Sequence, residues 1–374
     1  MFETNEAESP RVRRREILKV AAVAGVSLGL GMSPESVRSG TTVKKRKLKL
    51  GFDNFSIRAL GWKAPKLLDY AASLKVDTVL FSDLHVYGDL NDSTLREVKA
   101  RADDLGLVIH AGTGGVCPTS SRFDKTFGSA EEHLKTVIRV AKALGSPVAR
   151  CYVGAAEDRR GEGGIRRHMK STVEVCKRVR SAALQAGVKI AIENHAGDMQ
   201  ARELAELIES AGTDYVGATV DAGNATWTLE DPVRNLEILA PYAVSSGIRD
   251  SMVWEDARGA VVQWAAMGDG CVDLGGYFDR FEKRCPETPV QLEIISGFAR
   301  SFHYLDRGFW PPYAETRAED FAGFLALAKK GHRIPPFEPP EGADKKAAER
   351  DYQKTQLERS LRYARDALGL GLRS

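Results

Sequence analysis

The sequence lacks any run of eighteen or more apolar residues, so a conventional membrane-spanning helix is not expected. Its five cysteines are an odd number without C-x-x-C spacing, which argues against a disulfide framework and against a zinc knuckle. The formal net charge is only +3 over 374 residues, which argues against a nucleic-acid partner. What is present is an ordinary soluble composition with enough apolar residues for a large core.

The first forty residues differ from the rest of the chain. Arg13, Arg14 and Arg15 precede an apolar stretch at 20–32, which is the pattern of a signal peptide. The segment RREILK at 14–19 resembles the twin-arginine export motif; a basic amphipathic helix is the alternative. We therefore expect a periplasmic or extracytoplasmic protein whose partner during export is the twin-arginine translocase. Because no small-x-small cleavage site follows, retention of the segment as a membrane anchor is also open.

Eight short apolar runs alternate with longer helical patterns between residues 47 and 332. Units of this kind, each of roughly thirty residues, predict an α/β fold of the (β/α)8 TIM barrel type. An open doubly wound sheet is the alternative, but the first strand–helix connection, GFDNFSIRALG at 51–61, is not the glycine-rich phosphate loop that such a sheet would need. The strand-like runs lie at 48–55, 78–83, 107–112, 147–153, 189–194, 216–221, 243–251 and 290–295.

The chain changes character after the barrel region. Four prolines within RIPPFEPPEG, at 333–342, break regular structure and indicate a linker. Residues 343–368 then have the pattern of one charged helix, with Leu357, Leu361, Tyr363 and Leu368 available to dock. We interpret 1–40 as the export signal, 47–332 as the barrel, and 333–374 as a linker and C-terminal helical extension.

Acidic residues follow the ends of three predicted strands. Glu193 ends the fifth strand, Asp221 ends the sixth, and Glu293 lies at the end of the eighth. In a TIM barrel these strand ends meet at one mouth, where three like charges would repel one another unless a cation lies between them. Oxygen ligands favour Mn²⁺, Mg²⁺, Co²⁺ or Zn²⁺. Each acid taken alone could instead form a salt bridge or cap a helix.

Four short motifs carry a family resemblance: AIENH at 191–195, TVDAGN at 219–224, MGDGCVDL at 267–274 and QLEI at 291–294. With them, residues 47–332 resemble the xylose-isomerase-like barrels of the sugar phosphate isomerase/epimerase family, which are relatives of ketose 3-epimerases and inosose dehydratase. The resemblance implies that Glu, Asp, His and Glu hold one divalent metal ion. It also implies that the two glutamates flank the reacting carbon of a sugar.

Three of the four implied ligands are present here, as Glu193, Asp221 and Glu293. The fourth is not, because Gly247 stands where the family's histidine would be, and a glycine has no side chain to ligate with. Either water or another group would then fill the fourth ligand position, or the metal site would be impaired. His195 is the nearest substitute ligand. Four further residues at the strand ends are expected to bind substrate: His110, Asn224, Arg249 and Asp250.

The resulting hypothesis is a metal-dependent sugar or keto-sugar isomerase or epimerase. Glu193 and Glu293 would be the catalytic residues, moving a proton next to a carbonyl through an enediolate. A dehydratase or lyase would use the same enolate and stays open. A non-catalytic sugar-binding barrel with a degenerate metal site is the other alternative, and Gly247 is the feature that favours it. The expected partner is a small sugar, and a homo-oligomer is one expectation for assembly.

Overall fold

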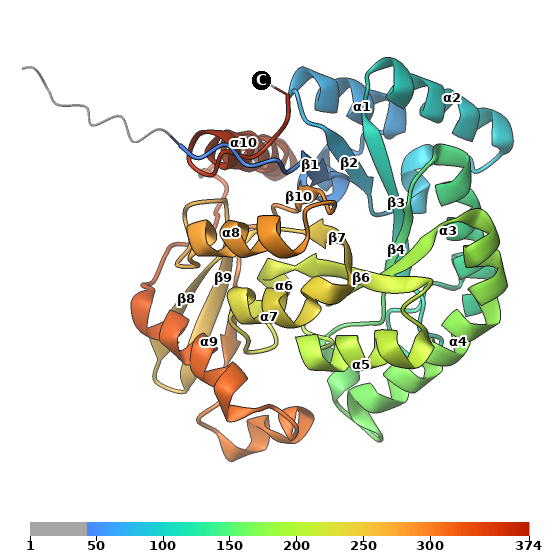
Figure 1. Cartoon of the computed structure of the whole chain (residues 1–374). Coiled ribbons are helices and arrows are strands. Elements are labelled where there is room, and N and C mark those ends of the chain that lie inside the picture. Colours follow the sequence, from blue (N-terminus) through green and yellow to red (C-terminus); the bar gives the residue numbers. More distant parts are fainter. Residues whose placement is uncertain (1–42, 374) are drawn as a thin grey trace, which may run out of the picture. The chain divides into compact units, whose positions relative to one another are not determined.

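The computed structural model describes residues 43–373, and the predicted export segment at 1–40 lies outside them. Eight parallel strands are hydrogen-bonded in the order β10-β1-β2-β3-β4-β5-β6-β7. The Ile248 N–H donates to the Gln291 carbonyl at 2.7 Å, which joins the end of β7 to β10 and nearly closes the barrel (Figure 1). The strands are β1 (Leu50–Asp53), β2 (Thr78–Phe81), β3 (Val108–Gly115), β4 (Val148–Tyr152), β5 (Lys189–Glu193), β6 (Val216–Asp221), β7 (Ala243–Gly247) and β10 (Val290–Leu292).

Amphipathic helices surround the barrel, and their ends follow local sequence signals. Ser129 and Glu132 form a capping box at the start of α3, and Gly145 ends that helix with a φ of 68°. With eight parallel strands inside and helices outside, the predicted TIM barrel is confirmed. The surrounding helices are α1 (Ala64–Ser73), α2 (Asp92–Asp104), α3 (Ala130–Leu144), α4 (Gly164–Ala186), α5 (Ala201–Ala211), α6 (Ala222–Thr226), α7 (Pro232–Leu239) and α8 (Leu274–Arg284). Short 3-10 helices are η1 (Asn54–Leu60), η2 (Leu84–Tyr87), η3 (Lys125–Phe127), η4 (Ala156–Arg159), η5 (Ala240–Tyr242), η6 (Arg307–Phe309) and η7 (Pro311–Tyr313).

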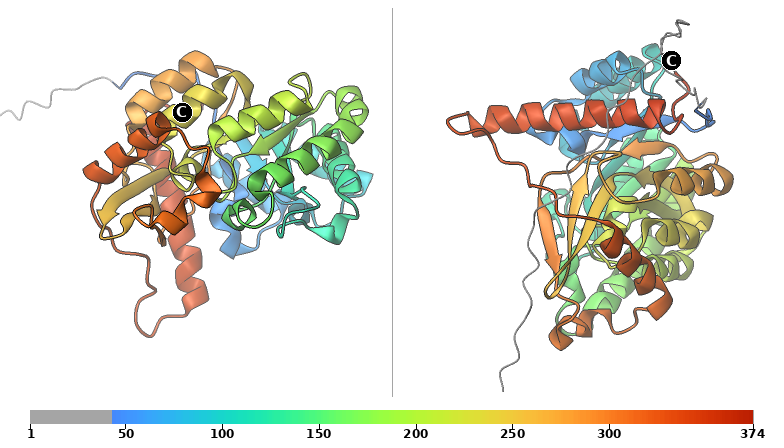
Figure 2. Two further views of the ribbon diagram at one scale, coloured as in Figure 1. Left: turned by 90° about the horizontal axis from the view of Figure 1, so that it is seen from below. Right: turned by 90° about the vertical axis from the view of Figure 1, so that its left-hand side faces the viewer.

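The long C-terminal helix α10 (Lys345–Asp366) packs against the barrel, as Figure 2 shows. Leu357, Leu361 and Leu368 are buried in the same hydrophobic core as the barrel strands. The Tyr70 hydroxyl on α1 donates to Glu358 of α10 at 2.8 Å. The predicted C-terminal helix is thus present. Its main neighbour is the 3-10 helix η1, and it also contacts β10.

A three-stranded antiparallel sheet lies beside the barrel, and the sequence patterns did not predict it. It consists of β8 (Asp250–Asp256), β9 (Gly259–Ala265) and β11 (Ala299–Phe302), in the order β11-β9-β8. Helix α9 (Ala318–Lys330) packs on it, and its Phe324 enters a second, separate core with Val253 and Val262 (Figure 1). Trp254 lies within β8.

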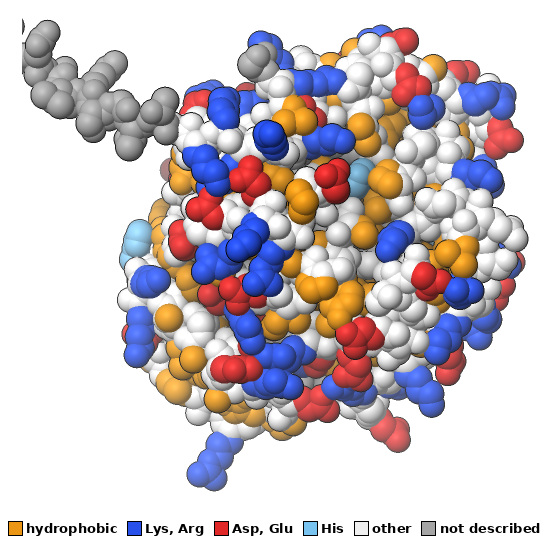
Figure 3. All heavy atoms as spheres, viewed as in Figure 1, with side chains coloured by type: hydrophobic (Ala, Val, Ile, Leu, Met, Phe, Trp, Pro, Cys, Tyr) orange, Lys and Arg blue, Asp and Glu red, His pale blue; other side chains and the backbone are white. Residues whose placement is uncertain are grey.

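On the face of the molecule drawn in Figure 3, basic and acidic side chains are interspersed and do not gather into regions of one sign. This distribution agrees with the small net charge of the chain. Among residues 43–373, no helix is both long enough and apolar enough to span a bilayer.

Candidate active site

Three acidic side chains meet at the carboxyl ends of the barrel strands, as the sequence predicts. Glu193 is the last residue of β5, Asp221 is the last residue of β6, and Glu293 directly follows β10. Each offers an oxygen atom, and these three oxygens lie within 4.8 Å of one another. All three side chains are buried, so their charges need compensation from the protein or from a bound ion.

Arg150 on β4 compensates Glu193. Its Nε donates to Oε2 of Glu193 at 2.6 Å, and its Nη1 donates to the Thr113 carbonyl at 3.0 Å. The amide of Asn224 donates to the other oxygen, Oε1, of Glu193 at 3.1 Å. Asn224, which we expected to bind substrate, therefore holds a catalytic candidate in place.

Arg249 compensates the other two acids. Its Nη2 donates both to Oδ2 of Asp221 and to Oε2 of Glu293. The guanidinium is buried and lies 4.2 Å from the centre of the Trp264 ring. Sequence analysis placed Arg249 among the substrate-binding residues, whereas here it bridges two of the three acids.

The three acids differ in their affinity for a proton. Burial raises the pKa of Glu193 to about 7, although Arg150 opposes this shift. Burial likewise raises the pKa of Asp221 well above its ordinary value, with Arg249 opposing. For Glu293 burial acts in the same direction, but Arg249 and Arg150 together outweigh it and lower the pKa. Asp221 therefore binds a proton more readily than an ordinary aspartate, whereas Glu293 binds one less readily than an ordinary glutamate.

A cavity of about 300 Å³ opens at the barrel mouth and reaches Glu293. Arg150, Tyr152 and His195 line it together with loop residues that follow the first three strands. Its remaining lining residues are Phe55, Ser82, Asp83, His85, Thr113, Gly114, Gly115, Arg122, Asp124 and Phe127.

His195 lies in the wall of this cavity rather than within the acid cluster. Its Nδ1 donates to the Gly154 carbonyl at 2.7 Å, and its ring stacks on Tyr152 with 3.7 Å between the ring centres. Burial, with help from Arg150, lowers the pKa of His195 to about 3, so the imidazole is neutral. Its role as a metal ligand remains a prediction.

Two other predicted substrate-binding residues make contacts inside the protein. His110 on β3 lies inside the barrel with its Nδ1 3.0 Å from the Ser245 hydroxyl, and burial lowers its pKa to about 4. Asp250 accepts hydrogen bonds from the backbone N–H groups of Gly268 at 3.1 Å and Gly270 at 2.9 Å. Asp250 thereby fixes the turn that follows β9.

Sequence reasoning did not single out Asp53 or Arg150. Asp53 ends β1, and burial together with the charge of Glu293 raises its pKa to about 7. Both residues are charged side chains within apolar strand runs, at 48–55 and 147–153. The sequence therefore did contain a signal for Asp53 and Arg150, because a charged side chain in a buried strand requires a partner.

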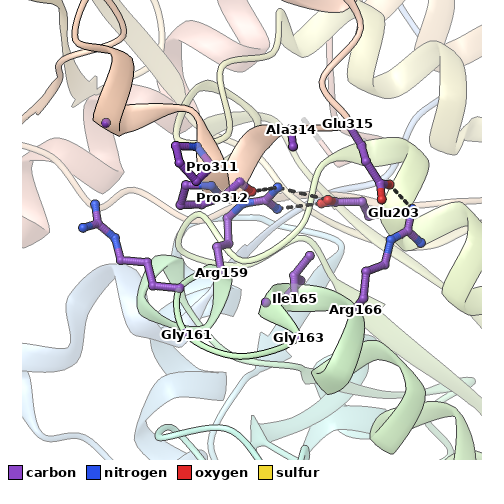
Figure 4. A pocket seen from close by; sticks show the side chains of 13 residues that line it. Arg159, Gly161, Gly163, Ile165, Arg166, Glu203, Pro311, Pro312, Ala314 and Glu315 are labelled. Atoms are coloured by element: carbon purple, nitrogen blue, oxygen red, sulfur yellow. Dashed lines mark hydrogen bonds and ion pairs between the residues drawn. The ribbon is translucent and has the colours of Figure 1, made fainter.

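A larger cavity of about 460 Å³ lies elsewhere and shares no lining residue with the acid cluster (Figure 4). Its buried guanidinium, Arg159, donates from Nη1 and Nη2 to the two oxygens of Glu203 at 2.6 and 3.0 Å. At its rim, Arg166 pairs with Glu315. Arg159 and Arg166 are thus paired with glutamates, Arg160 is a third arginine in the lining, and the acid cluster at the barrel mouth is the better candidate for acid–base chemistry.

The acid cluster can be tested for its fit to the expected divalent ion. The separation of the three oxygens is suitable for one ion. A Cβ atom on Gly247 would lie 3.1 Å from an Asp221 oxygen and 3.3 Å from a Glu293 oxygen, so a side chain at position 247 would point at the same atoms. However, the Arg249 guanidinium already contacts both oxygens. With Arg249 in this position, the residues do not fit a metal ion.

Residues 68–297 match the sequence profile of the xylose isomerase-like TIM barrel family. Among solved structures, a D-psicose 3-epimerase crystallised with D-fructose is similar, with 15% identity, a TM-score of 0.57, and coverage of 86% of this chain and 100% of that one. An L-ribulose 3-epimerase shares 18% identity, with a TM-score of 0.53 and coverage of 85% and 97%. The IolI protein, crystallised with a zinc atom, shares 15% identity, with a TM-score of 0.53 and coverage of 77% and 100%. Among curated proteins, none is similar in sequence to this chain.

Proposed function

The chain belongs to the xylose isomerase-like TIM barrel family, and from this premise we propose that it is a sugar or keto-sugar isomerase or epimerase. The observation that carries the proposal is the placement of Glu293. It is a nearly buried carboxylate that lines the mouth cavity and lies within 4.8 Å of a second carboxyl group, that of Glu193. A carboxylate that lines a cavity, with a second carboxyl group close to it, is suited to proton transfer at a carbon atom next to a carbonyl.

In the proposed reaction, Glu293 acts as the base because its pKa is the lower of the two. It takes the proton from the carbon next to the carbonyl, and the released electron pair forms an enediolate. Glu193, whose pKa burial raises to about 7, then gives a proton to a carbon atom of the enediolate, the electron pair returns to re-form the carbonyl, and Glu293 loses its proton to solvent. Arg150 and Arg249 place positive charge beside the cluster, which stabilises negative charge as it develops.

Two further observations support a sugar-sized substrate. The mouth cavity of about 300 Å³ combines the aromatic rings of Phe55 and Phe127 with polar groups such as His85 and Asp83. Aromatic faces pack on the C–H surfaces of sugars, and polar groups pair with the hydroxyls. The similar solved structures are named as epimerases of D-psicose and L-ribulose.

The sequence led us to expect a divalent ion, whether Mn²⁺, Mg²⁺, Co²⁺ or Zn²⁺, which the proposed reaction does not use. Glu193, Asp221 and Glu293 would be its ligands. When bound, such an ion would polarise the substrate oxygens. Arg249 would first have to leave its present contacts with Asp221 and Glu293.

The proposal is tested by deuterium exchange from solvent into a panel of keto-sugars, followed by NMR. Wild-type protein is expected to exchange the hydrogen next to the carbonyl of at least one member. Glu293→Gln keeps the side-chain shape but removes the base, and a loss of about 100-fold or more is expected. Glu287→Gln, an exposed position before β10, is the matched control. Wild-type protein that binds a keto-sugar yet catalyses no exchange would contradict the proposal.

We also propose export through the twin-arginine pathway, which rests on the motif at Arg14 and Arg15. Replacing both residues by lysine is expected to keep the protein in the cytoplasm, as cell fractionation would show. Unchanged export of this double variant would remove the proposal.

A further inference from the structure

The Arg249 side chain lies in a space that the surrounding residues leave for it. Gly223 follows β6, and a Cβ atom there would lie 2.5 Å from Cδ and 2.7 Å from Nε of Arg249. Real atoms do not approach so closely, so any other residue at position 223 would displace the arginine. Gly247 leaves the other side open, because a side chain there would meet the same two acid oxygens that Arg249 contacts.

Aromatic rings cover the face of the guanidinium. The Arg249 Cζ lies 4.2 Å from the centre of the Trp264 ring, a distance typical of a cation–π interaction. The Trp264 Nε1–H donates to the Gly223 carbonyl at 2.9 Å, and Trp227 stacks on the outer face of Trp264. The second sheet therefore supplies, through β9, the residue that holds Arg249 over the acids.

The two arginines already balance part of the charge of the cluster. Glu193, Asp221, Glu293 and the neighbouring Asp53 carry at most four negative charges, and Arg150 and Arg249 supply two positive ones. A divalent ion and the Arg249 guanidinium would compete for the same Asp221 and Glu293 oxygens.

We propose that the guanidinium of Arg249 is the resident cation of the acid cluster and takes the place of a divalent metal ion there. Asp221 and Glu293 hold this cation, and the Nε and Nη1 groups of Arg249 are buried without a hydrogen-bond partner. Those two groups are the guanidinium donors that the described residues leave without an acceptor. The proposal concerns which cation the acids hold, so it does not depend on the reaction proposed above.

Metal binding measured by calorimetry, with Mn²⁺ and Zn²⁺ as probes, tests the proposal without any assay of activity. Wild-type protein is expected to show no saturable binding at the acid cluster. Arg249→Met removes the competing charge, and one ion per chain is expected to bind at least about 100-fold more tightly than to the wild type. The double variant Gly247→His/Arg249→Met adds an imidazole directed at the same oxygens and is expected to bind more tightly still.

Arg249→Lys is the matched control, since it keeps a positive charge at the position and should not gain binding. If Arg249→Met does not fold, Gly223→Ala is the second variant, because its methyl group displaces the arginine without removing it from the chain. Gly223→Ala is then expected to gain metal binding that the wild type lacks. Wild-type protein that binds one ion per chain would overturn the proposal. So would the absence of any gain in both Arg249→Met and Gly223→Ala.

Discussion

Two buried arginines, Arg159 and Arg249, differ in how completely their donors are used. Both lie over an aromatic ring, with Arg159 4.4 Å from the centre of Tyr313 and Arg249 4.2 Å from that of Trp264. Every guanidinium nitrogen of Arg159 donates a hydrogen bond, to Glu203 or to backbone carbonyl groups. In Arg249 only Nη2 does so, and Nε and Nη1 have no partner.

The difference separates a structural ion pair from a candidate functional one. A buried charge is tolerated when its partner and its remaining donors are satisfied within the protein, as they are around Arg159. Arg249 instead bridges acids from two separate strands and leaves two donors unused, which costs stability. Eight other buried polar atoms among residues 43–373 also lack a partner, so it is the contact of Arg249 with Asp221 and Glu293, together with its unused donors, that favours a functional role.

The largest expected effect comes from removing the fully paired arginine. Arg159→Met leaves Glu203 buried without its partner, and a loss of about 3 to 5 kcal/mol in the free energy of unfolding is expected. Denaturant unfolding measures this loss, which Mn²⁺ should not reverse. In Arg249→Met, by contrast, added Mn²⁺ should restore stability. Arg160→Met, at an exposed neighbouring position, is the control. If Mn²⁺ restored the stability of Arg159→Met as well, the proposed distinction between the two sites would be wrong.

A buried acid without an arginine extends the comparison. Glu230 accepts hydrogen bonds from neutral donors, the Ala201 N–H at 3.0 Å and the Asn235 amide at 2.9 Å. Burial raises the pKa of Glu230 to about 7, from the usual 4.5 of a glutamate. The folded state therefore binds the proton more tightly than the unfolded state. The contribution of Glu230 to stability is complete below the pKa that this carboxyl group has in the unfolded state, and it is lost as the pH rises through about 7.

Glu230→Gln is accordingly expected to remove part of the decline in stability between pH 5 and pH 8. The pKa difference corresponds to on the order of 3 kcal/mol between these limits. Unfolding curves at several pH values, with the exposed Glu341→Gln as control, measure the slope. An unchanged slope in Glu230→Gln would show that this carboxyl group is not the one that titrates.

The contrast between the two arginines also marks what the sequence could predict. The eight barrel strands and the positions of Glu193, Asp221 and Glu293 followed from hydrophobic runs that end in acids, because parallel strand ends must converge. The role of Arg249 did not follow, because it depends on the distance to side chains on two other strands. The position of Arg249 depends as well on Trp264, whose ring lies against the guanidinium.

The sheet that carries Trp264 was itself missed. Its strands β8 and β9 form a hairpin beside the barrel, and the third strand, β11, comes from a segment more than thirty residues further along the chain. Sequence periodicity reports which face of a strand is buried, but it does not report which distant segment covers that face. Arg150 was overlooked for a related reason, since its partner Glu193 lies on the next strand.

The smallest expected effect concerns the rings beneath the two arginines. Trp264→Phe keeps an aromatic face near Arg249 but loses the hydrogen bond to Gly223, so a loss of about 1 to 2 kcal/mol in the free energy of unfolding is expected. Tyr313→Phe keeps the ring near Arg159, whose donors are held by Glu203 and backbone groups, and about 0.5 kcal/mol or less is expected. Trp264→Phe should also loosen Arg249 and make Mn²⁺ binding detectable at high concentration, whereas Tyr313→Phe should not. Equal losses, with no change in Mn²⁺ binding for either variant, would mean that Trp264 does not hold Arg249 over the acids.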